Sequence, residues 1–175
     1  MGQPPFIMIT LGIITLPDSL KIADWRNDYL KEGSLRSIAE TIKENQNEWL
    51  KNIQTDDSCH YFSIYNKKEL VGYCGLDKID KANNHAEVSL LIGREHSLKS
   101  YGRKAIGELL RVAFDNLKLN LVWGEVYNTT NNLKFWMKSG FIVDGRARMR
   151  KKWEGVYYSS TFISINSQEY RRKYE

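Results

Sequence analysis

The first third of the chain carries one strand pattern followed by two helix patterns. Residues Phe6–Leu16 are rich in Ile and Thr and end at a proline, which predicts a first strand. The same apolar segment is too short to span a bilayer as a helix. Asp18 is placed to cap a helix whose apolar positions include Ile22 and Tyr29. A Gly-Ser pair then separates this helix from a second one at residues 37–53. Because no apolar segment is long enough to cross a bilayer, we expect no membrane partner.

Strand patterns dominate the middle of the chain. Polar and apolar residues alternate in Tyr61–Tyr65, Leu70–Ile79 and Ala86–Ile92, and polar turns separate these segments. Because consecutive strands joined by short polar turns pair side by side, we expect a three-stranded antiparallel meander.

A long amphipathic helix separates the meander from the next strand. Apolar residues recur at helical spacing over Gly102–Leu117, and Leu121–Tyr127 follows as a strand. This strand-helix-strand order favours a right-handed crossover, in which Ala86–Ile92 and Leu121–Tyr127 are parallel.

The last part of the chain also contains a helix pattern followed by strand patterns. A helix is expected at Thr130–Lys138, followed by strands Phe141–Arg150 and Val156–Ile165 that turn at Glu154-Gly155. Together the elements predict a mixed α/β (α+β) fold with a mostly antiparallel central sheet, one parallel strand pair and helices on both faces.

Composition supports one folded unit. The chain has 175 residues, of which 42% are hydrophobic and 12% aromatic, so we expect residues 1–175 to form a single domain with a sizeable core. The two cysteines, Cys59 and Cys74, lack CxxC spacing and a metal-ligand pattern with His, so no metal is expected. Reduced core thiols are typical of a cytoplasmic protein.

The charge is basic, with a formal net charge of +5. Basic residues gather at Arg146–Lys152 and Arg171–Lys173, which favours an anionic partner or a solvated charged face. Nucleic-acid binding stays a minor alternative because no nucleic-acid motif accompanies the charge.

The segment between the third meander strand and the long helix is a candidate phosphate site. A helix N-terminus presents unpaired backbone N–H groups and partial positive charge to a diphosphate. Gly102 and the small Ser100 let that backbone approach closely, while Lys99, Arg103 and Lys104 add positive charge.

Three segments in this order resemble the GNAT superfamily of N-acetyltransferases. The family's phosphate loop reads Gln or Arg, two residues, Gly, one residue, then Gly or Ala. The matching positions here carry Ser in place of the first basic or amide residue and of the first Gly. They are Ser97, Leu98, Lys99, Ser100, Tyr101 and Gly102.

The second matching segment, Leu121–Tyr127, is similar to the family's strand that splays away from its parallel neighbour. The resemblance implies that the pantetheine arm of acetyl-CoA, or of CoA, enters the gap between the two strands. It also implies that the backbone near Leu91 and Ile92 supplies a hydrogen-bond donor there.

The third matching segment, Asn131–Phe141, looks like the family's late helix ending in Gly-Phe. The resemblance places Asn131 and Trp136 at the cofactor. Many members carry Tyr at the Trp136 position, where its phenol protonates the departing CoA thiolate; an indole is no comparable acid.

Catalytic groups must therefore be sought elsewhere. Glu87 and Glu125 are the candidate bases, because each sits in an apolar strand beside the proposed gap, where burial would raise a carboxyl pKa. Solubilising strand glutamates are the alternative. Tyr127 and Tyr101 are candidate proton donors, with packing roles as their alternative.

The acceptor side is expected to come from the early helices. Trp25, Arg26, Tyr29 and Arg36 are the candidate substrate residues, because Trp and Arg stack on or clamp an anionic acceptor. The alternative is that Trp25 packs its helix against the core and Arg26 pairs with a local acid. The region around Trp25 resembles a GNAT branch that modifies protein N-termini, polyamines or amino groups of nucleotide-linked sugars.

The resemblance implies acetyl transfer from acetyl-CoA to a primary amine without a metal. The acceptor is expected to be a small molecule, such as an amino sugar on a nucleotide carrier or a polyamine. A protein N-terminus and a non-catalytic CoA-binding GNAT domain are the alternatives, and a homodimer is left open.

Overall fold

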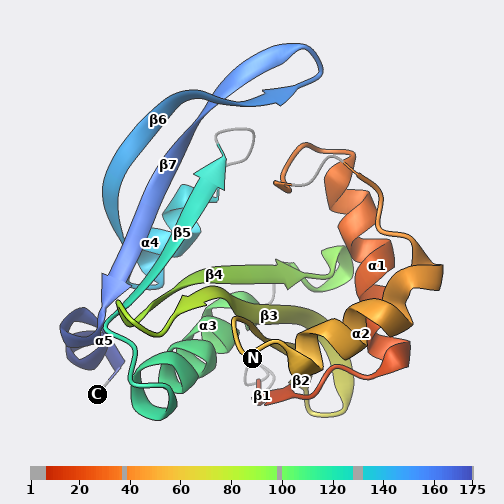
Figure 1. Ribbon diagram of the computed structural model, residues 1–175, viewed down its shortest axis with the longest axis horizontal. Coiled ribbons are helices and arrows are strands. Elements are labelled where there is room, and N and C mark those ends of the chain that lie inside the picture. Colours follow the sequence, from red (N-terminus) through yellow and green to blue (C-terminus); the bar gives the residue numbers. More distant parts are fainter. Residues whose placement is uncertain (1–6, 37–38, 98–99, 128–131, 175) are drawn as a thin grey trace, which may run out of the picture.

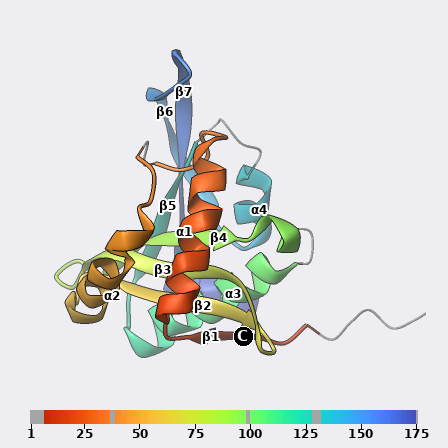
Figure 2. The same ribbon diagram turned by 90° about the vertical axis from the view of Figure 1, so that its right-hand side faces the viewer.

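The computed structural model describes residues 7–36, 39–97, 100–127 and 132–174. These residues contain a seven-stranded sheet in the order β1-β2-β3-β4-β5-β7-β6, and helices flank it (Figures 1 and 2). Among the strands of these described residues only the β4–β5 pair is parallel, so the expected mixed fold is confirmed. The strands are β1 Ile9–Gly12, β2 His60–Asn66, β3 Glu69–Asp80, β4 His85–Ile92, β5 Leu121–Tyr127, β6 Ile142–Trp153 and β7 Val156–Asn166. The α-helices are α1 Leu16–Leu30, α2 Gln46–Thr55, α3 Tyr101–Arg111, α4 Leu133–Lys138 and α5 Ser167–Tyr174.

The start of α1 differs from the prediction. Thr15, not Asp18, is the N-cap: Thr15 Oγ1 accepts from the Asp18 amide at 3.4 Å, and Asp18 Oδ2 accepts from the Thr15 amide at 3.0 Å. This reciprocal capping box begins the helix at Leu16 and limits β1 to four residues. Asp18 also accepts hydrogen bonds from the side chains of Ser63 and Tyr65, which anchors α1 to β2.

One helix is shorter than predicted, and another helix was not predicted. The second helix was expected at residues 37–53, but residues 39–42 are not helical and α2 begins at Gln46 after a short 3₁₀ turn; residues 37–38 lie outside the described chain. The C-terminal α5 was not predicted. Asn166 caps it by accepting a hydrogen bond from the Glu169 amide, and the Asn166 amide donates to the Glu169 carboxylate at 2.9 Å. Within the described ranges, no helix is long and apolar enough to cross a membrane.

Two hydrophobic cores lie on the two sides of the sheet. The larger one packs the apolar stripe of α3, including Ile106 and Leu109, against β2, β3, β4, β5 and β7. The smaller one packs Ile22 and Leu50, from α1 and α2, against Tyr73 of β3. The two cysteines are buried free thiols, as expected.

The central strands β4 and β5 part after a short stretch of pairing. They pair at His85 with Leu121, Ala86 with Val122 and Glu87 with Trp123. Beyond Glu87, β4 remains paired with β3 and β5 remains paired with β7. The expected gap between the two parallel strands is therefore present.

The β6–β7 hairpin projects beyond the rest of the sheet (Figure 1). Its turn lies at Glu154-Gly155, as predicted, but β6 continues to Trp153 rather than ending at Arg150. Its register shifts between Ala147 and Lys151, where β6 contains extra residues relative to β7. Beside this irregularity, Arg150 donates to Glu125 and Lys151 donates to the carbonyls of Gly33 and Leu35.

Candidate active site

A cavity of about 420 Å³ lies along β4, at the start of α3 and beside α4. We call it the strand-gap cavity. Its lining includes Ile92, Ser97, Ser100, Gly102, Arg103 and Trp136.

The α3 N-terminus presents a positive environment to this cavity. Ser100 is the N-cap and has a left-handed backbone with φ 59°, and the first turn contains no acidic residue. A Cβ on Gly102 would lie 3.1 Å from Phe135 of α4, so glycine allows α3 and α4 to approach closely here. Together with Arg103, this helix start fits a diphosphate group.

The backbone of β4 offers a donor to the gap at Ile92 rather than at Leu91. The Gly93 amide donates to Val71 of β3, so Gly93 faces β3. Because both polar groups of a residue point to one side and alternate along an antiparallel strand, Ile92 faces away from β3 and Leu91 faces it. The Ile92 carbonyl accordingly accepts from the Tyr29 hydroxyl at 2.9 Å.

Several expected cofactor residues lie elsewhere. Lys104 donates to the Ile7 carbonyl at 2.8 Å and is absent from the lining of the strand-gap cavity. Tyr101 is a buried core residue whose hydroxyl accepts from Asn66, so it is poorly placed for proton transfer. The predictions for Leu98, Lys99 and Asn131 fall outside the described residues.

A second cavity of about 230 Å³ adjoins the first. We call it the carboxylate pocket, because Glu87 and Glu125 line it together with Tyr127. Leu90, Leu91 and Trp136 line both cavities, so the two are continuous. Trp136 is held there by edge-to-face contacts with Phe135 and Phe141, at ring-centre distances of 5.2 and 5.1 Å.

Glu87 is held by two cations. Both terminal nitrogens of Arg36 donate to its carboxylate, with Nη1 3.0 Å from Oε2, and Lys78 Nζ lies 2.7 Å from Oε2. Burial raises the pKa of Glu87, but the hydrogen bonds from Arg36 and Lys78 outweigh it, so the pKa lies below its ordinary value. The expectation that burial would leave Glu87 with a raised pKa is therefore wrong.

Glu125 lies deeper and has a mixed set of partners. Its side chain is 3% exposed, and Ser160 Oγ and Arg150 Nε donate to Oε1 at 2.6 and 3.1 Å. The hydroxyl of Tyr127 donates to Oε2 at 3.3 Å, and Arg36 Nη2 lies 3.4 Å from the same oxygen. Arg36 thus joins both candidate bases.

Tyr127 completes this cluster. Its hydroxyl accepts from Arg36 Nε at 2.9 Å, and burial raises its pKa despite the nearby guanidinium. The phenol therefore keeps its proton at neutral pH and is available as a donor.

The four expected substrate residues do not share one site: two line the carboxylate pocket, one lines the strand-gap cavity and one lines neither. Arg36 lies at the centre of the carboxylate pocket, and Arg26 lines it while donating to the Tyr73 hydroxyl. Tyr29 lines the strand-gap cavity instead. Trp25 is buried under Gly93 and donates to Glu95 at 3.2 Å, so it is a core residue that lines neither cavity.

Lys151 of β6 is a site residue that sequence reasoning missed. It is buried, it donates to the carbonyls of Gly33 and Leu35, and its Nζ lies 4.5 Å from the centre of the Tyr127 ring. Burial lowers its pKa. The chain offered only a weak signal, because Lys151 belongs to a basic run that is typical of a solvated face.

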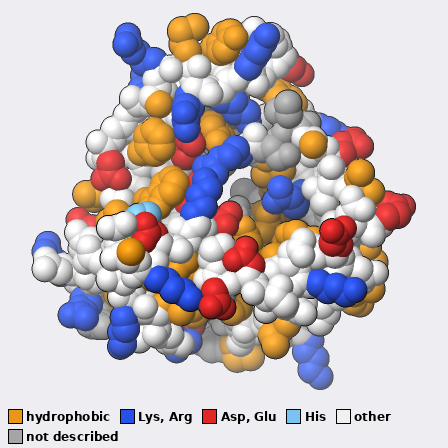
Figure 3. Space-filling model, in the orientation of Figure 1, with side chains coloured by type: hydrophobic (Ala, Val, Ile, Leu, Met, Phe, Trp, Pro, Cys, Tyr) orange, Lys and Arg blue, Asp and Glu red, His pale blue; other side chains and the backbone are white. Residues whose placement is uncertain are grey.

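Basic and acidic side chains meet around the hollow on the face shown in Figure 3. Among the described residues, no three His, Cys, Asp or Glu side chains are grouped as metal ligands would be.

Comparisons with known proteins agree with this architecture. A sequence model described as "Acetyltransferase (GNAT) domain" matches residues 11–162. The chain is 27% identical over 124 residues to the uncharacterized N-acetyltransferase p20 of Bacillus licheniformis, covering 69% of this chain and 70% of that protein.

Solved structures show the same fold. The spermidine N-acetyltransferase of Vibrio cholerae, in complex with CoA and spermine, superposes with a TM-score of 0.86 at 20% identity, covering 93% of this chain and 98% of that one. A probable acetyltransferase superposes with a TM-score of 0.79 at 20% identity, covering 92% and 94%. With its sequence matched over residues 11–162 and its sheet parted between β4 and β5, the chain belongs to the GNAT family and is an N-acetyltransferase.

Proposed function

We propose that this chain, as a single domain over residues 1–175, transfers an acetyl group from acetyl-CoA to a primary amine of a small cationic molecule. The observation that carries this proposal is the convergence of Glu87 and Glu125 on one cation, the Arg36 guanidinium, beside the strand gap. A site that already holds a cation between two carboxylates suits an acceptor that arrives as an ammonium ion.

The strand-gap cavity fits acetyl-CoA, which supplies the acetyl group as a thioester. The Ile92 amide faces the gap, and Ser100, Gly102 and Arg103 form a helix start suited to a diphosphate. Trp136 lies where the two cavities meet, so its ring would pack beside the acyl group.

The proton chemistry is assigned by the partners of each group. Glu87 binds both terminal nitrogens of Arg36 as well as Lys78 and has a lowered pKa, so we assign it to holding the acceptor rather than to taking its proton. Glu125 is the proposed base, because its contact with Arg36 is the longer one, at 3.4 Å, and the same oxygen lies beside the hydroxyl of the proposed proton donor. Tyr127 is the proposed proton donor to the leaving thiolate.

A polyamine is the first acceptor to test. The carboxylate pocket, at about 230 Å³, has room for the end of a slim chain once the half-exposed Arg36 side chain is displaced, a movement that the proposal requires. The Vibrio cholerae protein of the same fold is a spermidine N-acetyltransferase, which supports this choice.

An amino sugar on a nucleotide carrier is the second candidate. Arg26 and Arg36 both line the pocket, and guanidinium groups bind phosphate and carboxylate well. This acceptor would use Arg36 as a ligand instead of displacing it.

A thiol-release assay with acetyl-CoA and spermidine, a nucleotide-linked amino sugar or a short peptide tests the proposal. Spermidine should release CoA thiol at least tenfold faster than the peptide. Calorimetry with CoA is run beside it. CoA binding without thiol release from any amine would contradict the enzymatic proposal and favour a CoA-binding domain. Sedimentation velocity tests whether the chain forms a homodimer.

A further inference from the structure

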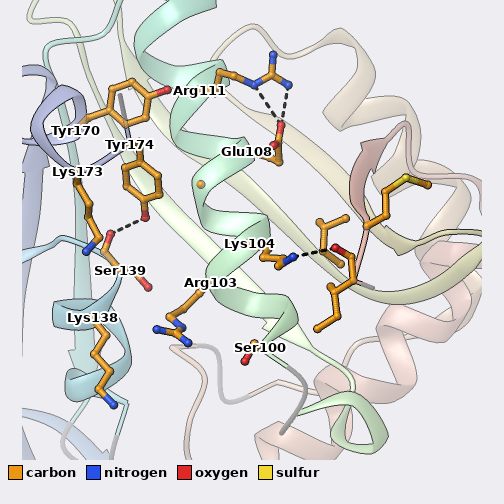
Figure 4. A pocket seen from close by; sticks show the side chains of 14 residues that line it. Ser100, Arg103, Lys104, Glu108, Arg111, Lys138, Ser139, Tyr170, Lys173 and Tyr174 are labelled. Carbon is orange, nitrogen blue, oxygen red and sulfur yellow. Dashed lines mark hydrogen bonds and ion pairs between the residues drawn. The ribbon is translucent and has the colours of Figure 1, made fainter. Parts of the chain in front are cut away.

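The largest cavity, about 680 Å³, runs along the exposed face of α3, and its labelled side chains come from α3, the end of α4 and α5 (Figure 4). It shares Ser100 and Arg103 with the strand-gap cavity. Among the described residues, it has no lining residue in common with the carboxylate pocket. The side chains that select an acceptor are therefore those of the carboxylate pocket itself.

Asp77 is an acid of the carboxylate pocket to which the proposed reaction gives no role. It lies on β3, directly opposite Glu87 of β4 in the antiparallel register. The side chains of such a cross-strand pair lie on the same face of the sheet, with Cβ atoms about 4.5–5.5 Å apart. Asp77 is therefore the neighbour of the carboxylate that we assign to holding the acceptor.

The next residue, Lys78, is directed to Glu87 rather than to Asp77. Its backbone is left-handed, with φ 50°, and the register of β3 with β4 shifts between Asp77 and Asp80. Neighbouring residues of a regular strand point to opposite faces, so this bulge accounts for a lysine that reaches the face on which Asp77 lies. The Lys78 ammonium lies 2.7 Å from Glu87 Oε2 and 5.6 Å from the centre of the Trp123 ring.

The negative charge of Asp77 is left without a cation. Glu87 and Glu125 are each paired with two cations. Among the described residues, Asp77 forms no ion pair, and its carboxylate accepts a hydrogen bond of 2.9 Å from the Lys78 amide. Burial raises the pKa of Tyr61, and the charge of Asp77 raises it further, so this neighbouring phenol keeps its proton.

Arg26, the other basic residue of the pocket besides Arg36 among the described lining, does not compensate Asp77. Its guanidinium donates to the hydroxyl of Tyr73 and to Thr41 Oγ1. Tyr73 comes four residues before Asp77 on β3, which is about 13 Å along a strand. The carboxylate of Asp77 is thus available to a cation that enters the pocket.

We propose that Asp77 determines acceptor specificity by binding a second ammonium group, while the reacting amine lies at Glu87 and Glu125. This inference rests on the proposed function and names the acceptor class more closely. The acceptor is a diamine or polyamine, and its two amino groups are separated by a short alkyl chain, because Asp77 and Glu87 are cross-strand neighbours.

A matched pair of acceptors tests this role. Butylamine and putrescine share the same alkyl chain, and only putrescine carries a second ammonium. For the wild-type chain, kcat/KM for putrescine should exceed that for butylamine by about tenfold or more, the effect of one charge-assisted contact. Asp77→Asn keeps the shape of the side chain and should remove this preference, mainly through KM. A purely structural defect would lower both activities together and leave their ratio unchanged.

Asp57→Asn is the control, because Asp57 is an exposed acid that pairs with Lys81 and lines neither the carboxylate pocket nor the strand-gap cavity. Its ratio should equal that of wild type, and Asp77→Glu, which keeps the charge, should retain the preference. The inference is overturned if the wild-type chain shows no preference or if Asp77→Asn keeps it.

Calorimetry separates the failure of this inference from the failure of the proposed function. Putrescine should bind Asp77→Asn about tenfold more weakly than wild type, whether or not acetyl transfer takes place. Equal affinities would reject the role of Asp77. Weakened binding without release of CoA thiol from either amine would support the ammonium site and reject only the proposed function.

Discussion

The guanidinium of Arg36 binds both carboxylate oxygens of Glu87, although the two residues are 51 positions apart in the chain. Arg36 follows α1, and Glu87 is the last residue of β4 that pairs with β5. This contact joins the loop after α1 to the point where the central strands part. It makes the acceptor side of the pocket depend on the position of one side chain.

Replacing Arg36 with Met should favour cationic acceptors. The substitution frees one face of Glu87 while Lys78 remains its partner, so an acceptor ammonium no longer competes with the guanidinium. We expect KM for spermidine to fall by about tenfold. Steady-state kinetics checks this, with Arg150→Met, which contacts Glu125 but not Glu87, as control. An unchanged or higher KM would contradict the role of Arg36 as a competing cation.

Glu87 should contribute to acid sensitivity. Its pKa in the folded chain lies below the ordinary value of 4.5, so its stabilisation is present above that pH and is lost as the pH falls through the folded pKa. Wild type should exceed Glu87→Gln in unfolding free energy at about pH 6, and the difference should narrow toward about pH 3. Urea denaturation at several pH values measures it, and a constant difference would argue against the ion pair.

Glu125→Gln should abolish most of the activity. An amide of the same shape keeps the Ser160 contact but cannot accept the proton of the acceptor, so kcat should fall by about 100-fold or more. CoA affinity should stay within about twofold, because Glu125 is absent from the strand-gap cavity. Glu87→Gln is the comparison variant and should act mainly on the acceptor KM. Equal kcat in Glu125→Gln and wild type would remove Glu125 as the base.

Tyr127→Phe tests the proton donor. Loss of the phenol should lower kcat by about tenfold to 100-fold without weakening CoA binding. A second substitution, Trp136→Tyr, places a phenol where the two cavities meet and should recover part of the lost rate. Full activity of Tyr127→Phe would show that water, or another group, supplies the proton.

Lys151→Met should loosen the loop that carries Arg36. The ammonium donates to the carbonyls of Gly33 and Leu35, and losing these charge-assisted hydrogen bonds costs about 1–3 kcal/mol of folding free energy. Denaturant unfolding should show this loss, and amide exchange of residues 33–36 should accelerate. The exposed neighbour Lys152 is the control, and its Met variant should behave as wild type in both measurements.

The parts of the site that the sequence predicted depend on local patterns. Alternation placed Ala86–Ile92 and Leu121–Tyr127 as strands, and the helix between them made the two strands parallel. Glu87 and Glu125 could therefore be placed beside the gap from their positions within these strands. Helix α5 was not predicted, although a local pattern indicates it: Asn166 and Glu169 have the spacing of a capping box.

The parts that were missed depend on contacts between distant segments. The pKa of Glu87 is lowered by Arg36 and Lys78, which lie in other segments of the chain, and no local sequence pattern predicts these partners. Trp25 has the residue type of a ligand-stacking side chain, but the close approach of Gly93 makes it a core residue. Burial of a lysine at position 151 likewise becomes visible only when β6 lies against the loop after α1.

Because of the register shift in β6, an insertion or deletion should disturb the hairpin near Ala147–Lys151 but not at its turn. Side chains of neighbouring strand residues ordinarily point to opposite faces, yet Arg150 binds Glu125 while Lys151 binds the loop at Gly33. Deleting one residue between Ala147 and Arg150 would reverse these directions and disconnect both contacts. The turn at Glu154-Gly155 lies outside these two contacts, so we expect an insertion there to leave both of them in place.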